Sequence, residues 1–303
     1  MSVSDWIAVD WGTTHVRAWA MDRDDRVLAH NTSDKGMGVL QPDEFEAALL
    51  ELVSPWLAPD QATQILACGM VGARQGWTEA DYLAVPTPPL MPVLFQEAPA
   101  ADARLVVSII PGLKQLDPPD VMRGEETQIA GFLSETPGFE GVVVMPGTHT
   151  KWVRVAEGKV LAFSSFMTGE VFSLLEHHSV LRHSLVGDGI HSDLFEETVM
   201  AVLADPGRAV SGLFRLRADD LLHGRDRSAL RAQLSAYLIG SELSAASEYW
   251  RDGQCVVIGA PHLTELYRSA LAAGGCAAHA HPADALTLKG LCAAKTLLRA
   301  REG

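Results

Sequence analysis

The chain has 303 residues, of which 48% are hydrophobic and 20% charged, so it can bury a large core and is long enough for two domains. Its formal net charge of -14 at pH 7 argues against nucleic acid or an anionic membrane as a partner, because both would be repelled over much of the surface. The four cysteines are scattered without a C-x-x-C pair, which indicates neither a disulfide framework nor a zinc site. With no export signal and no apolar run of membrane-spanning length, we expect a cytoplasmic, two-lobed protein.

The first residues predict an antiparallel meander. Apolar residues at 6–11 and 16–21 flank the turn Gly12-Thr13-Thr14, and a third strand is expected at about 26–33. This opening differs from a βαβ unit. Pro42 then precedes apolar residues at helical spacing, which predicts an amphipathic helix that ends near Pro59.

The middle of the chain contains a second strand-turn-strand pattern. Buried strands are expected at 65–68 and 105–110, and a proline-rich surface segment at 84–99. A helix at about 124–135 is followed by three further strands, at 141–145, 151–155 and 160–165. Because this pattern repeats the opening, we place the domain boundary near residue 137, between domains 1–136 and 137–303.

The remainder of the chain is expected to be mainly helical. Apolar periodicity predicts helices at 168–177, 191–204, 228–250 and 262–273, with a strand at 255–258. A final helix at about 283–301 carries Arg299 and Arg301 at its end, which suits the negative end of the helix dipole. We expect this helix to pack back toward the first domain.

The motif V-D-W-G-T-T-H-V-R-A-W carries the strongest local signal. Asp10 at the end of a buried strand, beside a Gly-Thr-Thr turn, can hold hydrated Mg²⁺ against a phosphate, while backbone N–H groups and hydroxyls of the turn contact phosphate oxygens. An ordinary Asp-Gly hairpin turn is the alternative. A second motif, M-P-G-T-H-T-K-W-V at 145–153, has the same pattern. Two such hairpins, each opening one half of the chain, favour a nucleotide clamped between two similar domains.

Two further elements have candidate roles. Glu125 and Glu126 stand at the start of the helix between the two halves, where a carboxylate could accept a proton from an attacking hydroxyl. They could equally complement the helix dipole alone. Gly259, at the end of the strand before Pro261, would let an adenine or a ribose approach the backbone.

These elements, in this order, resemble the sugar kinase, actin and Hsp70 ATPase superfamily over the whole chain. The combination of D-W-G-T-T, the loop from Cys68 to Trp77, M-R-G-E-E-T-Q and P-G-T-H-T-K-W is similar to the 2-dehydro-3-deoxygalactonokinases. The resemblance implies an α/β, two-domain actin-like ATPase (ribonuclease H-like) fold, with a mixed sheet flanked by helices in each domain. It also implies transfer of the ATP γ-phosphate to the 6-hydroxyl of 2-dehydro-3-deoxy-D-galactonate, with Mg²⁺ required.

The resemblance assigns roles to particular residues. Asp10 would position Mg²⁺, and Gly259 would belong to the adenosine-binding turn. Glu126 lines up best with the carboxylate that many sugar kinases place at the start of the connecting helix, which would make it the general base, with Glu125 as the close alternative. The second phosphate motif departs from the family pattern, since it lacks the Asp that many sugar kinases carry within or near it. The residues expected to contact phosphates are Gly12, Thr13, Thr14, Gly147, Thr148 and Thr150.

A 2-keto acid needs a cationic or N–H-rich pocket for its carboxylate, and Arg74, Gln75 and Arg123 are the candidates. Arg74 could also be an ordinary surface arginine, and Lys151 could serve phosphate or be solvated. His177, His178 and His183 are expected to pack or to lie on the surface, since adjacent helix positions point about 100° apart. Trp6, Trp11 and Trp19 are expected in the core, whereas Trp77 is not assigned.

Three functions remain open from the sequence. They are a kinase for this or a related 2-keto-3-deoxy sugar acid, a phosphohydrolase or ATPase of the same superfamily, and a non-catalytic nucleotide-binding or actin-like assembly module. The stereochemistry of the acid is not determined by the sequence, and the oligomeric state, including a homo-oligomer, is left open.

Overall fold

The structure is a computed structural model that describes residues 3–187 and 191–302. By its internal contacts the chain divides into two compact units. Unit 1 consists of Met1–Phe139, Glu157–Leu161 and Ala283–Gly303, and unit 2 of Glu140–Ala156 and Ala162–Pro282. The last helix therefore groups with the N-terminal residues, and unit 2 is inserted into the sequence of unit 1.

Unit 1 contains a six-stranded sheet of order β3-β2-β1-β4-β7-β6. Its strands are β1 Trp6–Trp11, β2 Val16–Met21, β3 Val27–Ser33, β4 Thr63–Gly69, β6 Gln96–Ala98 and β7 Leu105–Ile109. β1 pairs antiparallel with β2 and parallel with β4, and β2 pairs antiparallel with β3, so the predicted meander is confirmed. A smaller sheet, of order β5-β8-β9, is formed by β5 Tyr82–Ala84, β8 Gly112–Leu116 and β9 Pro119–Met122.

Helices cover both faces of the large sheet of unit 1. Alternate β1 residues, such as Val9 and Trp11, pack with α1 Phe45–Val53, because successive strand side chains point to opposite faces. Trp6 and Ala8 pack on the other face with α2 Glu125–Glu135 and α9 Ala283–Glu302. Short 3₁₀ helices complete the unit at η1 Met37–Val39, η2 Ser54–Trp56, η3 Met70–Gly72 and η4 Pro92–Leu94.

The first helix is shorter than the sequence predicts. Pro42 lies in a turn before the helix, and α1 ends at Val53, followed by η2 at 54–56. Pro55 explains the end, because proline lacks the N–H group that continues an α-helix and its ring clashes with the preceding turn.

Unit 2 repeats the strand pattern in a five-stranded sheet of order β12-β11-β10-β13-β14. Its strands are β10 Gly141–Met145, β11 Thr150–Ala156, β12 Lys159–Phe166, β13 Cys255–Gly259 and β14 Ala278–Pro282. β10 pairs antiparallel with β11 and parallel with β13, as β1 does with β2 and β4. The predicted second strand-turn-strand is thus confirmed.

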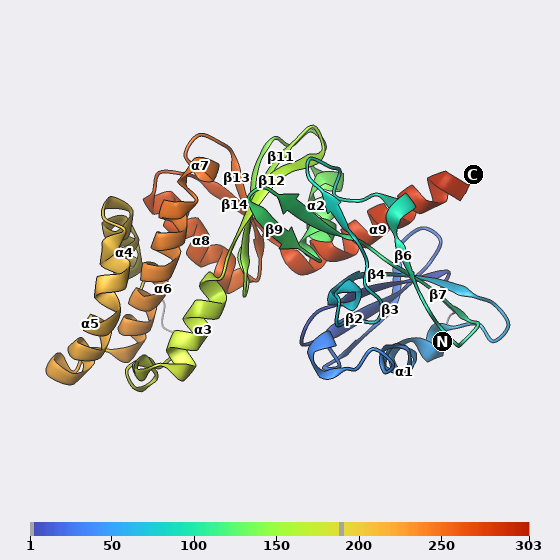
Figure 1. The fold of residues 1–303 in the computed structure, drawn as a ribbon, viewed down its shortest axis with the longest axis horizontal. Helices are drawn as coiled ribbons and strands as arrows, with labels where there is room; N and C mark the ends of the chain where they lie inside the picture. Colours follow the sequence, from blue (N-terminus) through green and yellow to red (C-terminus); the bar gives the residue numbers. More distant parts are fainter. Residues whose placement is uncertain (1–2, 188–190, 303) are drawn as a thin grey trace. The chain divides into compact units, whose positions relative to one another are not determined.

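The helices of unit 2 are α3 Thr168–His178, α4 Ser192–Ala204, α5 Gly207–His223, α6 Arg227–Ala245, α7 Ser247–Trp250 and α8 Pro261–Ala273, with η5 Val180–His183 between α3 and α4. Helices α4 and α5 pack against α6 (Figure 1). The core lies between the sheet and these helices, where Trp152, Phe195 and Leu243 are buried. Local signals set the helix ends: the Asp226 side chain accepts from Ser228 N at the start of α6, and Gly224 ends α5 in a left-handed conformation.

Several elements were not predicted from the sequence. They are α5, the hairpin β8–β9, the strand β14, and the short strands β5 and β6 beside the proline-rich segment. Helix α5 gives a weak pattern because Val210 and Phe214 are exposed on it, so its apolar residues do not follow one buried face. The helix predicted at 228–250 is two helices, α6 and α7. Within 3–187 and 191–302, no helix is both long enough and apolar enough to span a membrane.

Candidate active site

The loop between β1 and β2 is held by hydrogen bonds to η1. Three backbone N–H groups donate to carbonyl oxygens of the loop: Met37 to Gly12 (3.0 Å), Gly38 to Thr13 (2.8 Å) and Gly36 to Thr14 (3.2 Å). In a planar trans peptide the N–H group points opposite to the preceding C=O. The N–H groups of Thr13, Thr14 and His15 therefore point away from η1. Successive N–H groups with this arrangement form a concave site for an anion.

Gly36 allows this close approach. A Cβ atom at position 36 would lie 2.3 Å from the carbonyl carbon of Thr14 and 2.4 Å from the oxygen of Thr13. Any side chain there would push the loop out of place, so the loop conformation depends on a residue more than twenty positions away in the sequence.

Asp10 lies at the β1 end of the same loop and is partly exposed. Its Oδ2 atom is 2.5 Å from Nη2 of Arg17, and the Arg17 Nη1 atom is 2.5 Å from Oδ1 of the exposed Asp284 on α9. The Cys68 thiol donates to Asp10 Oδ1 at 3.8 Å. The two ion pairs raise the pKa of Arg17 against the opposing effect of its burial. The carboxylate is thus fixed at the end of the strand with part of its surface exposed.

Glu126 lies at the start of α2 and is fully buried. Its Oε2 atom accepts from Gly124 N at 2.7 Å, and its Oε1 atom accepts from the hydroxyl of Thr127 at 2.9 Å. Burial, followed by the charge of Glu125, raises the pKa of Glu126 to about 7. Glu125 is half-buried, and its Oε2 atom accepts from Arg123 N at 3.0 Å. Both carboxylates therefore interact with the backbone of the turn before α2.

Two glycines bring this turn close to the end of β4. Gly69 and Gly124 have φ values of +88° and +103°, which glycine adopts without strain. A Cβ atom on Gly124 would be 3.4 Å from Cα of Gly69, and one on Gly69 would be 3.5 Å from Oδ1 of Asp10. Burial, then the charges of Asp10 and Glu126, raises the pKa of the Cys68 thiol. Asp10 and Glu126 therefore lie in one region of unit 1, both near Cys68.

In unit 2 the corresponding loop, between β10 and β11, contacts the start of α3 and the end of β13. The Glu170 N–H group donates to Thr148 O at 3.0 Å, and a Cβ atom on Gly169 would lie 2.2 Å from Gly147 O. A Cβ atom on Gly259 would be 3.2 Å from the Pro146 ring, so Gly259 adjoins this loop as well. Gly147 is half-buried and Thr148 is exposed.

Thr150 and Lys151 face inward in unit 2. The Thr150 hydroxyl is fully buried and lies 2.9 Å from the Tyr267 hydroxyl. The suggestion that Lys151 is solvated was wrong: its side chain is 5% exposed and its ammonium group donates to His149 O at 3.4 Å. Both residues begin β11, where the strand has already entered the core.

A cavity of about 330 Å³ adjoins this loop and lies entirely within unit 2. It begins at Gly147 and Thr148 and is walled by the α3 residues Thr168, Gly169, Phe172 and Glu176, the α6 residues Arg231, Ser235, Leu238 and Ile239, and the α8 residues His262, Leu263, Leu266 and Tyr267. At its far end the Arg231 Nε atom is 2.5 Å from Glu176 Oε1, and the guanidinium carbon lies 4.9 Å from the centre of the Phe172 ring. The walls are mainly apolar with a few polar groups, as in pockets for small molecules.

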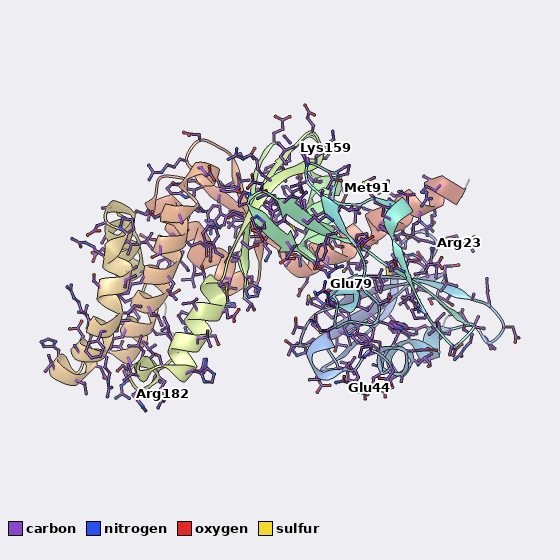
Figure 2. All side chains as sticks on the ribbon, in the orientation of Figure 1. Arg23, Glu44, Glu79, Met91, Lys159 and Arg182 are labelled. Atoms are coloured by element: carbon purple, nitrogen blue, oxygen red, sulfur yellow. The ribbon has the colours of Figure 1, made fainter. Side chains whose placement is uncertain are left out.

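The three candidates for the substrate carboxylate lie in different surroundings. Arg74 is 80% exposed and forms an ion pair with Glu79 at 3.5 Å; Glu79 is labelled in Figure 2. Gln75 is exposed beside it. Arg123 instead stacks on the Tyr82 ring, 4.2 Å from its centre, and donates to Ala80 O at 2.6 Å. Its Nη1 atom is buried without a hydrogen-bond partner among the described residues.

The other singled-out side chains are structural. His177, His178 and His183 are exposed, and the described part of the chain holds no group of three His, Cys, Asp or Glu residues that could bind a metal. Trp77 is 8% exposed and packs on Phe45, with 6.4 Å between ring centres, so it belongs to the core of unit 1. As predicted, Trp6 and Trp11 are fully buried and Trp19 packs against the core.

Sequence reasoning missed several residues of the site. They are Arg17, Gly36, Gly69, Gly169 and the cavity residues of α3, α6 and α8. The glycine pair Gly36 and Gly38, soon after the first loop, was the one local signal available. The cavity residues recur at three- and four-residue spacing on their helices, which on its own indicates only a buried helix face.

Comparison with known proteins agrees with this arrangement. The family model for 2-keto-3-deoxy-galactonokinase matches residues 10–294. The "Probable 2-dehydro-3-deoxygalactonokinase DgoK1" of Rhizobium meliloti (strain 1021) is 40% identical over 95% of this chain and 96% of its own length. The 2-dehydro-3-deoxygalactonokinase of Escherichia coli (strain K12) is 33% identical over 89% of this chain and 90% of its own length.

Solved structures give the same result. The crystal structure of a Sinorhizobium meliloti protein named for the same activity superimposes with a TM-score of 0.88 and 38% identity, over 97% of this chain and 96% of that one. The activator of 2-hydroxyisocaproyl-CoA dehydratase from Clostridium difficile, solved with bound ADPNP, has a TM-score of 0.53 at 12% identity, over 98% of this chain and 97% of that one. This second likeness concerns the fold alone, and it confirms the predicted α/β, actin-like fold. The chain belongs to the 2-keto-3-deoxy-galactonokinase family.

Proposed function

We propose that this protein phosphorylates 2-dehydro-3-deoxy-D-galactonate with ATP, at the 6-hydroxyl of the sugar acid. The observation that carries the proposal is the match, along nearly the whole chain, to proteins named for this activity. The two loops and the cavity support it, because phosphoryl transfer requires positioning and charge neutralisation more than covalent chemistry from the protein.

The cavity of unit 2 is the proposed site for the adenosine part of ATP. Its apolar walls, including Phe172, Leu238 and Leu263, suit a flat base, and Gly147 and Thr148 stand where phosphates would follow. On α3, Thr168 and Glu176 are eight residues apart, or about 12 Å at the helical rise. The adenine would therefore lie toward Glu176 and Arg231, and Gly259 would lie beside the loop that contains Gly147 and Thr148.

The loop between β1 and β2 in unit 1 is also proposed to bind phosphate. The N–H groups of Thr13 and Thr14 point away from η1, and the loop carries two hydroxyl side chains and Gly12. Anions bind to such N–H groups without a counter-charge from a side chain.

Asp10 fits the role of Mg²⁺ ligand. A carboxylate oxygen is the donor that Mg²⁺ prefers, and this ion usually takes one or two carboxylates together with waters and substrate phosphates. Bound Mg²⁺ would neutralise charge on the transferred phosphate. Asp10→Asn should lower turnover at least about 100-fold, as loss of one positioned electrostatic contact does. Asp284→Asn, which leaves Asp10 intact, is the control, and a loss below about threefold in Asp10→Asn would reject the role.

Glu126 is the proposed general base, with Glu125 as the alternative. A pKa near 7 suits proton acceptance at neutral pH, which favours Glu126. Because this carboxylate has no exposed surface, the role requires the turn at Gly124 to move when ligands bind. Glu125 is more accessible and needs no such movement.

Arg74 and Gln75 are proposed to bind the substrate carboxylate, since their side chains are exposed next to a buried turn. Arg123, the third candidate, already uses its guanidinium to bind Ala80 and Tyr82. We therefore propose that Arg123 holds the 70–82 segment on which the other two stand.

A coupled assay of ADP release over a panel of 2-keto-3-deoxy sugar acids tests the function. The expected result is ATP consumption that depends on the acid and is fastest with the galactonate-derived compound. Faster turnover with another acid would identify that acid as the substrate, and hydrolysis of ATP without any acid would indicate an ATPase. No turnover with any acid, together with ATP binding, would indicate a non-catalytic module.

A further inference from the structure

Glu242 is a buried carboxylate for which the proposed reaction has no use. It lies on α6, one turn beyond the cavity residues Leu238 and Ile239 and on the same helix face, and its exposed fraction is 3%. A buried charge is costly unless hydrogen bonds satisfy it, so its presence calls for an explanation.

The carboxylate accepts hydrogen bonds from elements on two sides. The Trp152 indole N–H on β11 donates to Oε1 at 2.7 Å, and the Tyr267 hydroxyl on α8 donates to Oε2 at 2.8 Å. The Thr150 hydroxyl lies 2.9 Å from the Tyr267 hydroxyl, and Thr168 at the start of α3 also hydrogen-bonds to Glu242. One side chain thus connects β11, α3, α6 and α8.

The direction of these bonds follows from the chemistry of the groups. An ionised carboxylate only accepts, so Tyr267 must give its one proton to Glu242. The Thr150 hydroxyl must then give its proton to the Tyr267 oxygen. These bonds fix Thr150, the first residue of β11, directly after the loop from Gly147 to His149. Two other members of the network, Thr168 and Tyr267, line the cavity.

We propose that Glu242 is a positioning residue for the nucleotide. It holds the loop from Gly147 to His149 and the α3 and α8 walls of the cavity in the geometry that binds ATP. This inference rests on the proposed function, in which the cavity takes the nucleotide. Glu242 itself does not touch the nucleotide, since it acts through Thr150, Thr168 and Tyr267.

The test is Glu242→Gln, which keeps the size of the side chain but presents N–H groups to the donors. We expect the KM for ATP to rise at least about tenfold, while kcat at saturating ATP and the KM for the sugar acid change less than about twofold. Trp152→Phe, which removes one donor outside the cavity, should raise the KM for ATP in the same way. Glu248→Gln, an exposed site on α7, is the matched control and should behave as the wild type.

The outcomes separate this inference from the function itself. If the wild-type protein neither phosphorylates the acid nor binds ATP in calorimetry, the proposed function fails. If the wild type is active and both Glu242→Gln and Trp152→Phe keep their KM for ATP, the inference is wrong. A fall in kcat together with a similar rise in both KM values would also overturn the inference, because it would indicate general damage to the fold. Should Glu242→Gln not fold, Trp152→Phe alone decides the result.

Discussion

At the scale of single residues, burial sets the chemistry of the carboxylates. Asp10 keeps part of its surface exposed and is paired with Arg17, whereas Glu126 is sealed inside unit 1 with a pKa raised to about 7. The two groups lie near the same thiol and yet differ in environment. This contrast suits a metal-binding carboxylate beside a proton acceptor.

The first prediction concerns the pH dependence of Glu126. Because a base must be ionised, turnover should rise as the pH increases through about 7 and then level off. Glu126→Gln should lower turnover at least about 100-fold, whereas Glu125→Gln should lower it by less than about tenfold. Turnover rates of the three proteins between pH 5.5 and 8.5 check this, and the opposite order of the two variants would assign the base to Glu125.

The same pKa has a consequence for stability that does not depend on catalysis. The folded state raises the pKa of Glu126 from 4.5 to about 7, so it favours the protonated form. The free energy of unfolding should therefore fall by roughly 3 kcal/mol as the pH rises through that window, on the linkage relation. In Glu126→Gln this part of the pH dependence should disappear, as urea titrations at several pH values would show.

At the scale of elements, the sequence predicts what short-range patterns determine. The strands around Gly12 and Gly147 follow from apolar runs that end in turn residues, and the start of α2 follows from the spacing after Gly124. The support for these loops comes from residues distant in the sequence, and apart from the glycine pair Gly36 and Gly38 no local pattern reveals it. The inward orientation of Thr150 is an example, since it depends on Tyr267, 117 positions later.

The second prediction tests the support of the first loop by η1. Gly36→Ala places a Cβ atom against the backbone of Thr13 and Thr14, so the loop must shift. We expect the KM for ATP to rise or turnover to fall at least about tenfold, with a loss of stability of about 1–3 kcal/mol, as for other overpacked sites. Steady-state kinetics and thermal unfolding measure both effects. Gly253→Ala, where the nearest atom is 3.8 Å away, is the control; identical behaviour of the two variants would contradict the prediction.

The third prediction concerns the cavity between α3, α6 and α8. Ser235→Leu fills part of its volume with apolar atoms from the α6 wall. ATP binding should weaken at least about tenfold in calorimetry, while the far-UV circular dichroism stays that of the wild type. Ser211→Leu makes the same change on the exposed side of α5 and should leave binding unaltered. Unchanged ATP affinity in Ser235→Leu would remove the nucleotide from this cavity.

At the scale of the whole molecule, the chain contains the same strand arrangement twice. The order β3-β2-β1-β4-β7 of unit 1 corresponds to β12-β11-β10-β13-β14 of unit 2, with a glycine-containing loop after the first strand of each. The sequence indicated the repeat through its two hairpins. The sequence predicts that the last helix packs back toward the first domain, but it does not show which element the helix meets there, because that depends on the close contact of α9 with α2.

The fourth prediction tests this contact. A Cβ atom on Gly290 of α9 would lie 1.9 Å from Thr127 O, and one on Gly131 of α2 would lie 2.0 Å from Leu286 O. Gly290→Ala should therefore force the helices apart and lower the free energy of unfolding by about 3 kcal/mol or more, the upper end for overpacking. Ala300→Ser, exposed on the same helix, is the control. A melting temperature equal to that of the wild type would show that α9 packs differently.

The grouping of α9 with unit 1 also determines the order in which the protein can form during synthesis. Residues 140–282 leave the ribosome before the last helix does, so most of unit 2 is complete while unit 1 still lacks the helix that covers one face of its sheet. Until α9 has left the ribosome, the apolar side chains that meet Leu291 and Ala294 have no cover. The N-terminal half, although made first, is thus expected to be the last to fold, and a nascent chain stalled before residue 283 should be the form that chaperones bind.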